Sequence, residues 1–120
     1  MRICVACAYP GGPGAAIVDP LETSEILDYY DLKDDCEYEH VAQTTKCLGG
    51  CSDLIESIVG RRVDGIIVGN LSPASLLRLK YGGVRIFITR NPSVKESIGL
   101  LCEKKLEEIG LDQFSKLARK

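Results

Sequence analysis

The sequence lacks tryptophan, and it contains only one methionine, one histidine and two phenylalanines in 120 residues. It also lacks any apolar run near the ~20 residues that a membrane-spanning helix requires, so no membrane segment is expected. A formal net charge of −2 provides no basic excess for nucleic acid, which is therefore not an expected partner. A single histidine argues against a Ser-His-Asp triad and against a zinc site built from several histidines.

Cysteine, in contrast, is present in unusual number, with six copies. The first ten residues lack the long apolar region of a secretory signal peptide, which predicts a cytoplasmic protein. Because cytoplasmic thiols stay reduced, we do not expect three disulfides. The cysteines are expected to act as packing residues, metal ligands or redox thiols.

The length predicts a single domain, 1–120, since domains usually contain about 100–200 residues. Alternating apolar residues and turn signals in the first half predict four strands, at 2–9, 15–18, 25–33 and 36–45. The second half predicts a helix from Ser52 to Gly60, a strand at 64–69, a helix from Ser72 to Gly82, a strand at 84–89 and a helix from Ser93 to Ile109. The tail, 111–120, is either a short extra helix or a frayed end. The order ββββαβαβα predicts an α/β fold with a mixed sheet that is parallel in its second half.

Charged residues are unevenly distributed along this order. Nine of the seventeen acidic residues lie between Asp19 and Glu39, and they include Asp28. Such a run usually covers a solvated outer face, so these side chains are expected to be exposed. Basic residues predominate from Lys46 to Arg90, either as another solvated face or as a side that attracts an anionic ligand toward helix N-termini.

The stretch with the strongest indication of chemistry is Cys47-Leu48-Gly49-Gly50-Cys51, just before a predicted helix. Gly49 and Gly50 give the backbone the freedom to turn both sulfurs toward one point. The unpaired N–H groups and dipole of the helix favour thiolates, which bind soft metals and iron–sulfur clusters. Cys47 and Cys51 are therefore candidate metal ligands, candidate redox thiols, or packing residues of a glycine-rich turn.

The other cysteines and the histidine give weaker signals. Cys4 and Cys7 have an odd spacing within a predicted strand, so they face opposite sides and are expected to pack in the core. Cys36 and Cys102 are also expected to be structural, and Cys36 or Cys7 is left open as a third metal ligand. His40 is a candidate third metal ligand, with a hydrogen-bonded or surface histidine as the alternative.

Two glycine-containing loops are candidate walls of a ligand site. The loop around Gly12 is not a P-loop, because no Gly-Lys-Ser/Thr sequence follows it. Gly69, Asn70 and Ser72 lie at the carboxyl end of a predicted parallel strand, where open α/β sheets bind ligands. An ordinary strand-to-helix turn is the alternative for this second loop.

Three segments resemble the dinitrogenase iron–molybdenum cofactor biosynthesis family, which includes NifX, NafY and the C-terminal domain of NifB. They are R-I-C-V-A near the start, V-D-G-I-I-V-G-N-L-S-P-A at 63–74 and G-V-R-I-F-I at 83–88. The resemblance extends over residues 1–105 and implies a three-layer, ribonuclease-H-like fold. It also implies a carrier of iron–sulfur or iron–molybdenum cluster precursors rather than an enzyme. Members commonly have His-Phe-Gly after the second strand, where this chain has 17–22 without histidine, and Cys47 and Cys51 would replace that histidine.

The expected function is therefore a small cytoplasmic protein that binds or carries a metallocluster and catalyses no reaction. The metal ligands would be Cys47, Cys51 and His40. Further cluster-binding positions would be Gly12, Gly49, Gly50, Gly69, Asn70 and Ser72. The partners would be proteins that donate or accept the cluster, and self-association is left open. The alternatives are a redox sensor in which Cys47 and Cys51 form a reversible disulfide, and a metal-free interaction module. The first strand, 2–9, holds no acidic residue, so the two-metal nuclease chemistry of this fold is not expected.

Overall fold

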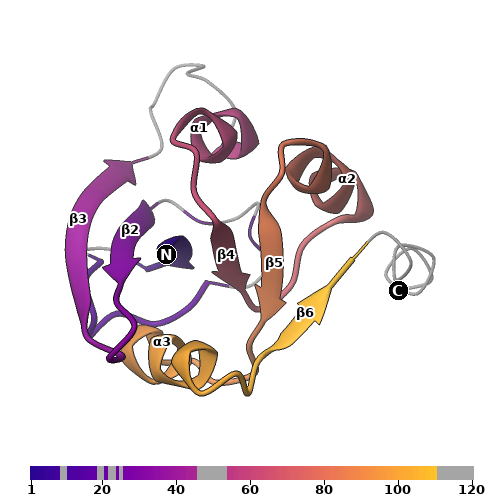
Figure 1. Ribbon diagram of the computed structural model, residues 1–120. Coiled ribbons are helices and arrows are strands. Elements are labelled where there is room, and N and C mark those ends of the chain that lie inside the picture. The colour runs from indigo at the N-terminus through magenta and orange to yellow at the C-terminus, as the bar shows by residue number, and fades with distance from the viewer. Residues whose placement is uncertain (9–10, 19–20, 22–23, 25, 46–53, 111–120) are drawn as a thin grey trace.

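The computed structural model describes residues 1–8, 11–18, 21, 24, 26–45 and 54–110. In this part of the chain one six-stranded mixed sheet has the order β3-β2-β1-β4-β5-β6 (Figure 1). The elements are β1 (Arg2–Cys7), β2 (Ile26–Leu32), β3 (Tyr38–Thr45), α1 (Leu54–Gly60), β4 (Gly65–Val68), α2 (Pro73–Tyr81), β5 (Arg85–Ile88), α3 (Val94–Cys102) and β6 (Glu107–Ile109). The central strands β1, β4 and β5 are parallel, while β2, β3 and β6 run antiparallel to their neighbours. The predicted α/β class and mixed sheet are confirmed.

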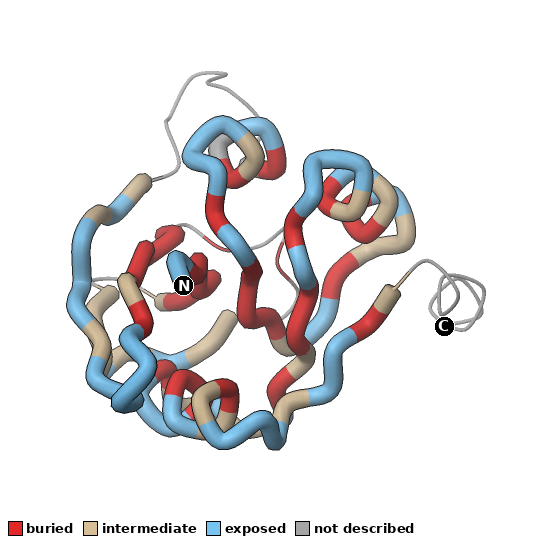
Figure 2. Tube along the Cα trace, in the orientation of Figure 1, coloured by how far each residue is buried: buried red, intermediate tan, exposed pale blue. Residues whose placement is uncertain are grey.

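The sheet is the middle of three layers, with α1 and α2 on one face and α3 on the other (Figure 1). β1 shows why it lies at the centre. Ile3, Val5 and Cys7 pack in the core on the α3 side, whereas Cys4 and Ala6 pack in the core beneath α1 and α2. All five are fully buried, so the strand is covered on both faces as its alternation predicts (Figure 2).

The predicted starts of α2 and α3 are confirmed by their caps. The side chain of Ser72 accepts a hydrogen bond from Ser75 N at 3.2 Å, and Pro73 follows in the first turn. The side chain of Ser93 accepts from Glu96 N at 3.2 Å. Both starts were predictable because capping depends only on residues close together in the sequence.

The predicted order ββββαβαβα is wrong at two places, and the observed order is βββαβαβαβ. The segment 15–18 forms only isolated bridges, from Ile17 to Cys7 and from Ala16 to Ser93. It pairs once with each of two different elements, so no continuous strand forms.

The second error concerns the last helix, which ends at Cys102 rather than at Ile109. A turn with Lys104 at φ +61° follows, and the chain then runs back along β5 as β6. Ile109 lies opposite Ile86 and packs in the core beneath α1 and α2, on the face away from α3. The apolar side chain of Ile109 has the spacing expected on the apolar side of the last helix, but the residue lies in a strand of the sheet.

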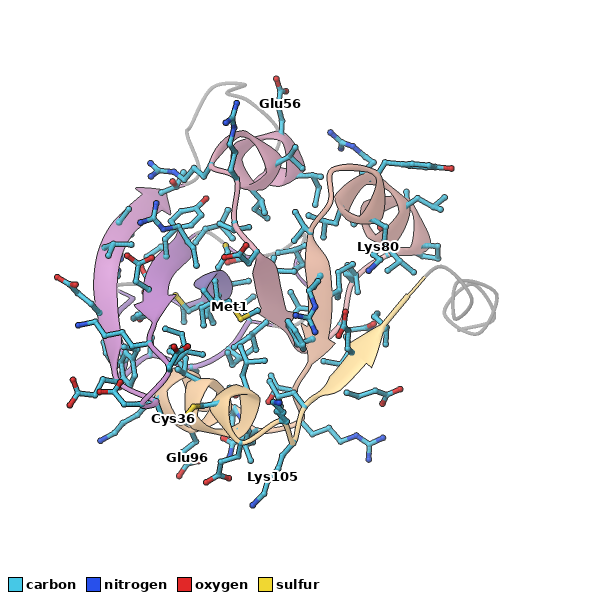
Figure 3. All side chains as sticks on the ribbon, viewed as in Figure 1. Met1, Cys36, Glu56, Lys80, Glu96 and Lys105 are labelled. Atoms are coloured by element: carbon cyan, nitrogen blue, oxygen red, sulfur yellow. A yellow bond between two sulfur atoms is a disulfide. The ribbon has the colours of Figure 1, made fainter. Side chains whose placement is uncertain are left out.

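The expectation that cysteines remain thiols is also wrong, because Cys36 and Cys102 form a disulfide. Their Cα atoms are 5.7 Å apart although 66 positions separate them in the sequence. Cys36 lies in the turn between β2 and β3, and this turn is placed beside the end of α3 (Figure 3). Cys4 and Cys7 are free and buried, as expected for packing residues. Of the helices in the described part of the chain, none has the length and apolar character needed to cross a membrane.

Candidate functional site

A buried carboxylate lies at the centre of the most elaborate polar cluster in the described part of the chain. It belongs to Asp28 in the middle of β2, and its side chain is 0% exposed. Two donors approach Oδ1 and three approach Oδ2. They are Gln43 Nε2 at 2.8 Å and His40 Nε2 at 3.1 Å on Oδ1, and Gly12 N at 2.5 Å, Cys7 Sγ at 3.3 Å and Tyr30 OH at 3.4 Å on Oδ2. Five donors on one carboxylate satisfy a charge that burial alone would make costly.

Strand pairing explains how these side chains meet. Asp28 lies opposite Gln43 on β3, and Tyr30 lies opposite His40. The register shifts between Tyr29 and Tyr30, so the bulge places His40 within reach of the Asp28 carboxylate. Neighbours on two strands thereby supply most of the cluster.

The loop after β1 completes the cluster and requires glycine at Gly11. This residue has φ +82°, a conformation that L side chains rarely adopt. A Cβ atom there would lie 2.8 Å from Asp28 Oδ2 and would also overlap the Gln43 amide. The backbone can therefore approach closely enough for Gly12 N to bind the carboxylate.

His40 is held on two sides and partly open on the others. Because an ionised carboxylate only accepts, Nε2 of His40 is the donor to Asp28. The imidazole also stacks on Tyr30, with ring centroids 4.9 Å apart and planes 26° apart. The side chain is 35% exposed, and among the described residues Nδ1 has no hydrogen-bond partner. This is the arrangement in which a carboxylate orients a histidine so that its other nitrogen can bind a metal.

The protonation states of the cluster follow from burial and mutual contact. Burial alone would raise the pKa of Asp28, but hydrogen bonds from Gly12, Gln43 and Cys7 and the charge of His40 outweigh it and hold the pKa below its ordinary value. Burial, together with the Asp28 charge, raises the pKa of the Cys7 thiol to about 12. The same two causes raise the pKa of Tyr30. At neutral pH, therefore, Asp28 is an anion and Cys7 is a neutral donor rather than a nucleophile.

We expect the contribution of Asp28 to stability to be lost in acid. A carboxylate whose pKa is lower in the folded state stabilises the fold above its unfolded pKa of about 4, and this contribution falls as the pH drops through the folded pKa. The difference in free energy of unfolding between the parent and Asp28→Asn should therefore shrink below about pH 4. Urea unfolding from pH 7 to pH 2.5 measures this, and a constant difference would contradict it.

Of the predicted site residues, the structure brings His40 and Gly12 together, because both bind Asp28. Gly69, Asn70 and Ser72 follow β4, which lies two strands from β2. Asn70 Oδ1 accepts from Leu71 N at 2.9 Å, and Ser72 caps α2. The side chains of Asn70 and Ser72 thus serve the strand-to-helix turn, which was the alternative interpretation of this loop.

The remaining predicted positions, Cys47, Cys51, Gly49 and Gly50, lie outside the described residues. Within the described ranges there is no group of three or more histidine, cysteine, aspartate or glutamate side chains that could hold a metal ion. The described cluster therefore offers one oriented ligand, His40, rather than a complete metal site.

Asp28 is the central residue of the candidate site that sequence reasoning missed, since it was grouped with acids on a solvated face. The structure corrects this, because Asp28 is buried. A signal was present: its neighbours in Ile26–Leu32 are nearly all apolar or aromatic. An acid in the middle of such a strand indicates a buried carboxylate that needs partners.

Comparisons with known proteins show that several solved structures have a similar fold. No family model and no curated protein matches the chain. Its fold is similar to that of a Thermotoga protein provisionally named as a NifB protein, with 23% identity, 89% of this chain and 91% of the other covered, and a TM-score of 0.68. A Methanocaldococcus jannaschii protein provisionally named as a dinitrogenase has 18% identity, coverage of 91% and 94%, and a TM-score of 0.70. The apo form of the orange protein from Desulfovibrio gigas has 11% identity, coverage of 90% and 92%, and a TM-score of 0.69.

Proposed function

We propose that this chain is a small cytoplasmic carrier that binds an iron–sulfur or iron–molybdenum cluster precursor as cargo and catalyses no reaction. We place it in the dinitrogenase iron–molybdenum cofactor biosynthesis family, with a ribonuclease-H-like fold. Two observations support this: the segments at 63–74 and 83–88 resemble that family, and solved structures with nitrogenase-related names share the fold. The partners of such a carrier are proteins that donate and accept the cluster.

The observation that carries the proposal is the fixed orientation of His40. Asp28 binds Nε2, and Tyr30 stacks on the ring, so Nδ1 is left as a ligand atom at a partly exposed position. A ligand that is already oriented loses little entropy when it binds metal, and the carboxylate raises its basicity. In this proposal Asp28 is a positioning residue that acts through His40.

The thiolate ligands in this proposal are Cys47 and Cys51, which follow β3 in the sequence. Iron–sulfur clusters are bound by thiolates, and the described free cysteines are poor candidates for that role. Cys4 is fully buried, while Cys7 donates to Asp28 and has a pKa near 12. Glycine and polar positions at Gly12, Gly49, Gly50, Gly69, Asn70 and Ser72 would frame the cargo.

Anaerobic reconstitution with iron and sulfide tests this function. We expect the parent protein to acquire visible absorbance from bound cluster, and the variant Cys47→Ala/Cys51→Ala to lose most of it. His40→Gln can still donate to Asp28 but lacks Nδ1, so it should alter the absorbance spectrum and bind less iron per chain.

The matched control is Cys36→Ser/Cys102→Ser, which removes two cysteines from elsewhere in the chain and should retain the absorbance. Iron and sulfide analysis of each variant gives the stoichiometry. A parent protein without a chromophore, or an unchanged chromophore in Cys47→Ala/Cys51→Ala, would rule out the proposed ligands.

A further inference from the structure

The disulfide between Cys36 and Cys102 joins two residues that both reach the surface of the protein. Cys36 is exposed in the turn that joins β2 to β3, and Cys102 is half-buried at the last position of α3. The free thiols of Cys4 and Cys7, in contrast, are both 0% exposed. Among the described cysteines, therefore, only the two that form the disulfide have surface exposed to solvent.

The backbone at Cys36 is also strained. Its φ of +70° lies in the left-handed region, which costs a non-glycine residue free energy that other contacts must supply. Besides the disulfide, two backbone hydrogen bonds hold the turn, from Cys36 N to the Lys33 carbonyl at 3.0 Å and from Lys33 N to the Glu37 carbonyl at 2.8 Å. Exposed and strained disulfides are the ones that exchange readily with thiols.

The two segments that the disulfide joins differ in net charge. The turn carries three exposed carboxylates and one cation, namely Asp34, Asp35, Glu37 and Lys33. At the end of α3, Lys105 pairs with Glu103 at 3.1 Å, which leaves the charge of Lys104 in excess. The turn that carries Cys36 thus has a net negative charge, whereas the segment at the end of α3 has a small net positive charge.

The space beside Cys102 suits a departing thiolate. An open cavity of about 560 Å³ beside Cys102 is lined partly by apolar side chains and partly by Lys33, Lys104, Asp34 and the ion pair of Arg85 with Glu108. Lys33 and Lys104 line the same cavity as Cys102, so positive charge lies near the position where negative charge appears when the S–S bond breaks. A more stable leaving thiolate makes exchange faster.

We propose that Cys36–Cys102 is a reversible thiol–disulfide exchange site that takes small thiols without negative charge. The thiolate of the incoming reagent attacks Cys36 Sγ, a new S–S bond forms to Cys36, and the bond to Cys102 breaks. Cys102 leaves as a thiolate and takes a proton from water. A second equivalent of thiol then attacks the mixed disulfide, releasing the reagent as its own disulfide and Cys36 as a thiol. The protein is reduced by two electrons, two reagent thiols are oxidised, and excess oxidised reagent reverses the sequence.

The test measures loss of the cross-link under native conditions. In the oxidised protein, trypsin should release peptides 34–46 and 96–104 as one linked species that mass spectrometry identifies. Cysteamine, 2-mercaptoethanol and 2-mercaptoethanesulfonate have similar size and carry positive, zero and negative charge beside the thiol. The rate of cleavage is divided by the concentration of ionised thiol in each reagent. At low salt, we expect this rate constant to be at least about threefold larger for cysteamine than for the sulfonate.

The three reagents also differ in the intrinsic reactivity of their thiols. Variants that change the charge of the protein show how much of the rate difference comes from electrostatic attraction. Glu37→Gln should narrow the ratio between cysteamine and the sulfonate, whereas Glu56→Gln on α1, far from Cys36 in Figure 3, should leave it unchanged. Re-formation of the linked peptide after addition of cystamine would support reversibility. Absence of the linked peptide, exchange only in denaturant, or equal ratios in all three proteins would overturn the proposal.

Discussion

Replacing Asp28 with alanine is expected to lower the free energy of unfolding by about 4 kcal/mol, because it removes the common acceptor of five donors. His40 and Gln43 can turn toward solvent after the change. Cys7 and Tyr30 cannot, since both are fully buried. Each buried donor without a partner costs roughly 1–3 kcal/mol, and the shortened side chain adds a cavity.

Two further variants identify the cause of this loss. Asp28→Asn keeps the size of the side chain and one acceptor oxygen, so we expect roughly half the loss. Asp31→Ala, on the same strand, removes a carboxylate that pairs with Arg2 at the surface, and it should have a much smaller effect. Urea unfolding followed by circular dichroism measures all three. A loss below about 1 kcal/mol for Asp28→Ala would show that the cluster is not an anchor.

The same substitution also tests the coupling between the cluster and the loop. Gly12 N binds Asp28 Oδ2, and the positive φ of Gly11 lets the loop lie close to the carboxylate. Without the carboxylate the loop loses this bond and His40 loses its orienting partner. The positioning role of Asp28 therefore predicts that stability and metal binding decline together.

The parts of the fold that the sequence predicts correctly depend on local information. The N-caps of Ser72 and Ser93 involve residues only three positions away. The uninterrupted apolar run from Ile3 to Cys7 predicts that β1 is buried on both faces, and the structure confirms it. Local spacing gives the wrong result at Ile109. Its position fits the apolar side of α3, but the residue lies in β6 and pairs with Ile86 on β5. The choice between these two places is made by tertiary packing.

In the candidate site, too, the sequence predicts individual residues from local features but not the contacts between distant residues. His40 was predicted as a ligand from its residue type alone, and Gly12 from its glycine-rich loop. What joins them is Asp28, whose partners lie 12 to 21 positions away in four of the five cases. A set of contacts between distant residues leaves no periodic signal in one sequence. The disulfide likewise joins residues 66 positions apart, and an argument from cellular compartment excluded it.

The second large effect is expected from the disulfide. Replacing Cys102 with serine, or reducing the parent protein, should lower the free energy of unfolding by about 4 kcal/mol, since a cross-link that closes 66 residues restricts the unfolded chain. Part of this loss should be offset, because the turn at Cys36 can then leave its strained φ of +70°. The net change in a reversible thermal or urea transition measures the balance of the two.

The pattern across variants distinguishes a cross-link from ordinary packing. Cys36→Ser, Cys102→Ser and the double variant should all have the same stability, because each removes the same bond. A reductant should destabilise the parent protein to their level and leave the variants unchanged. If the single variants differ strongly from each other, or if the reductant has no effect on the parent, packing of the individual side chains rather than the cross-link stabilises this corner of the fold.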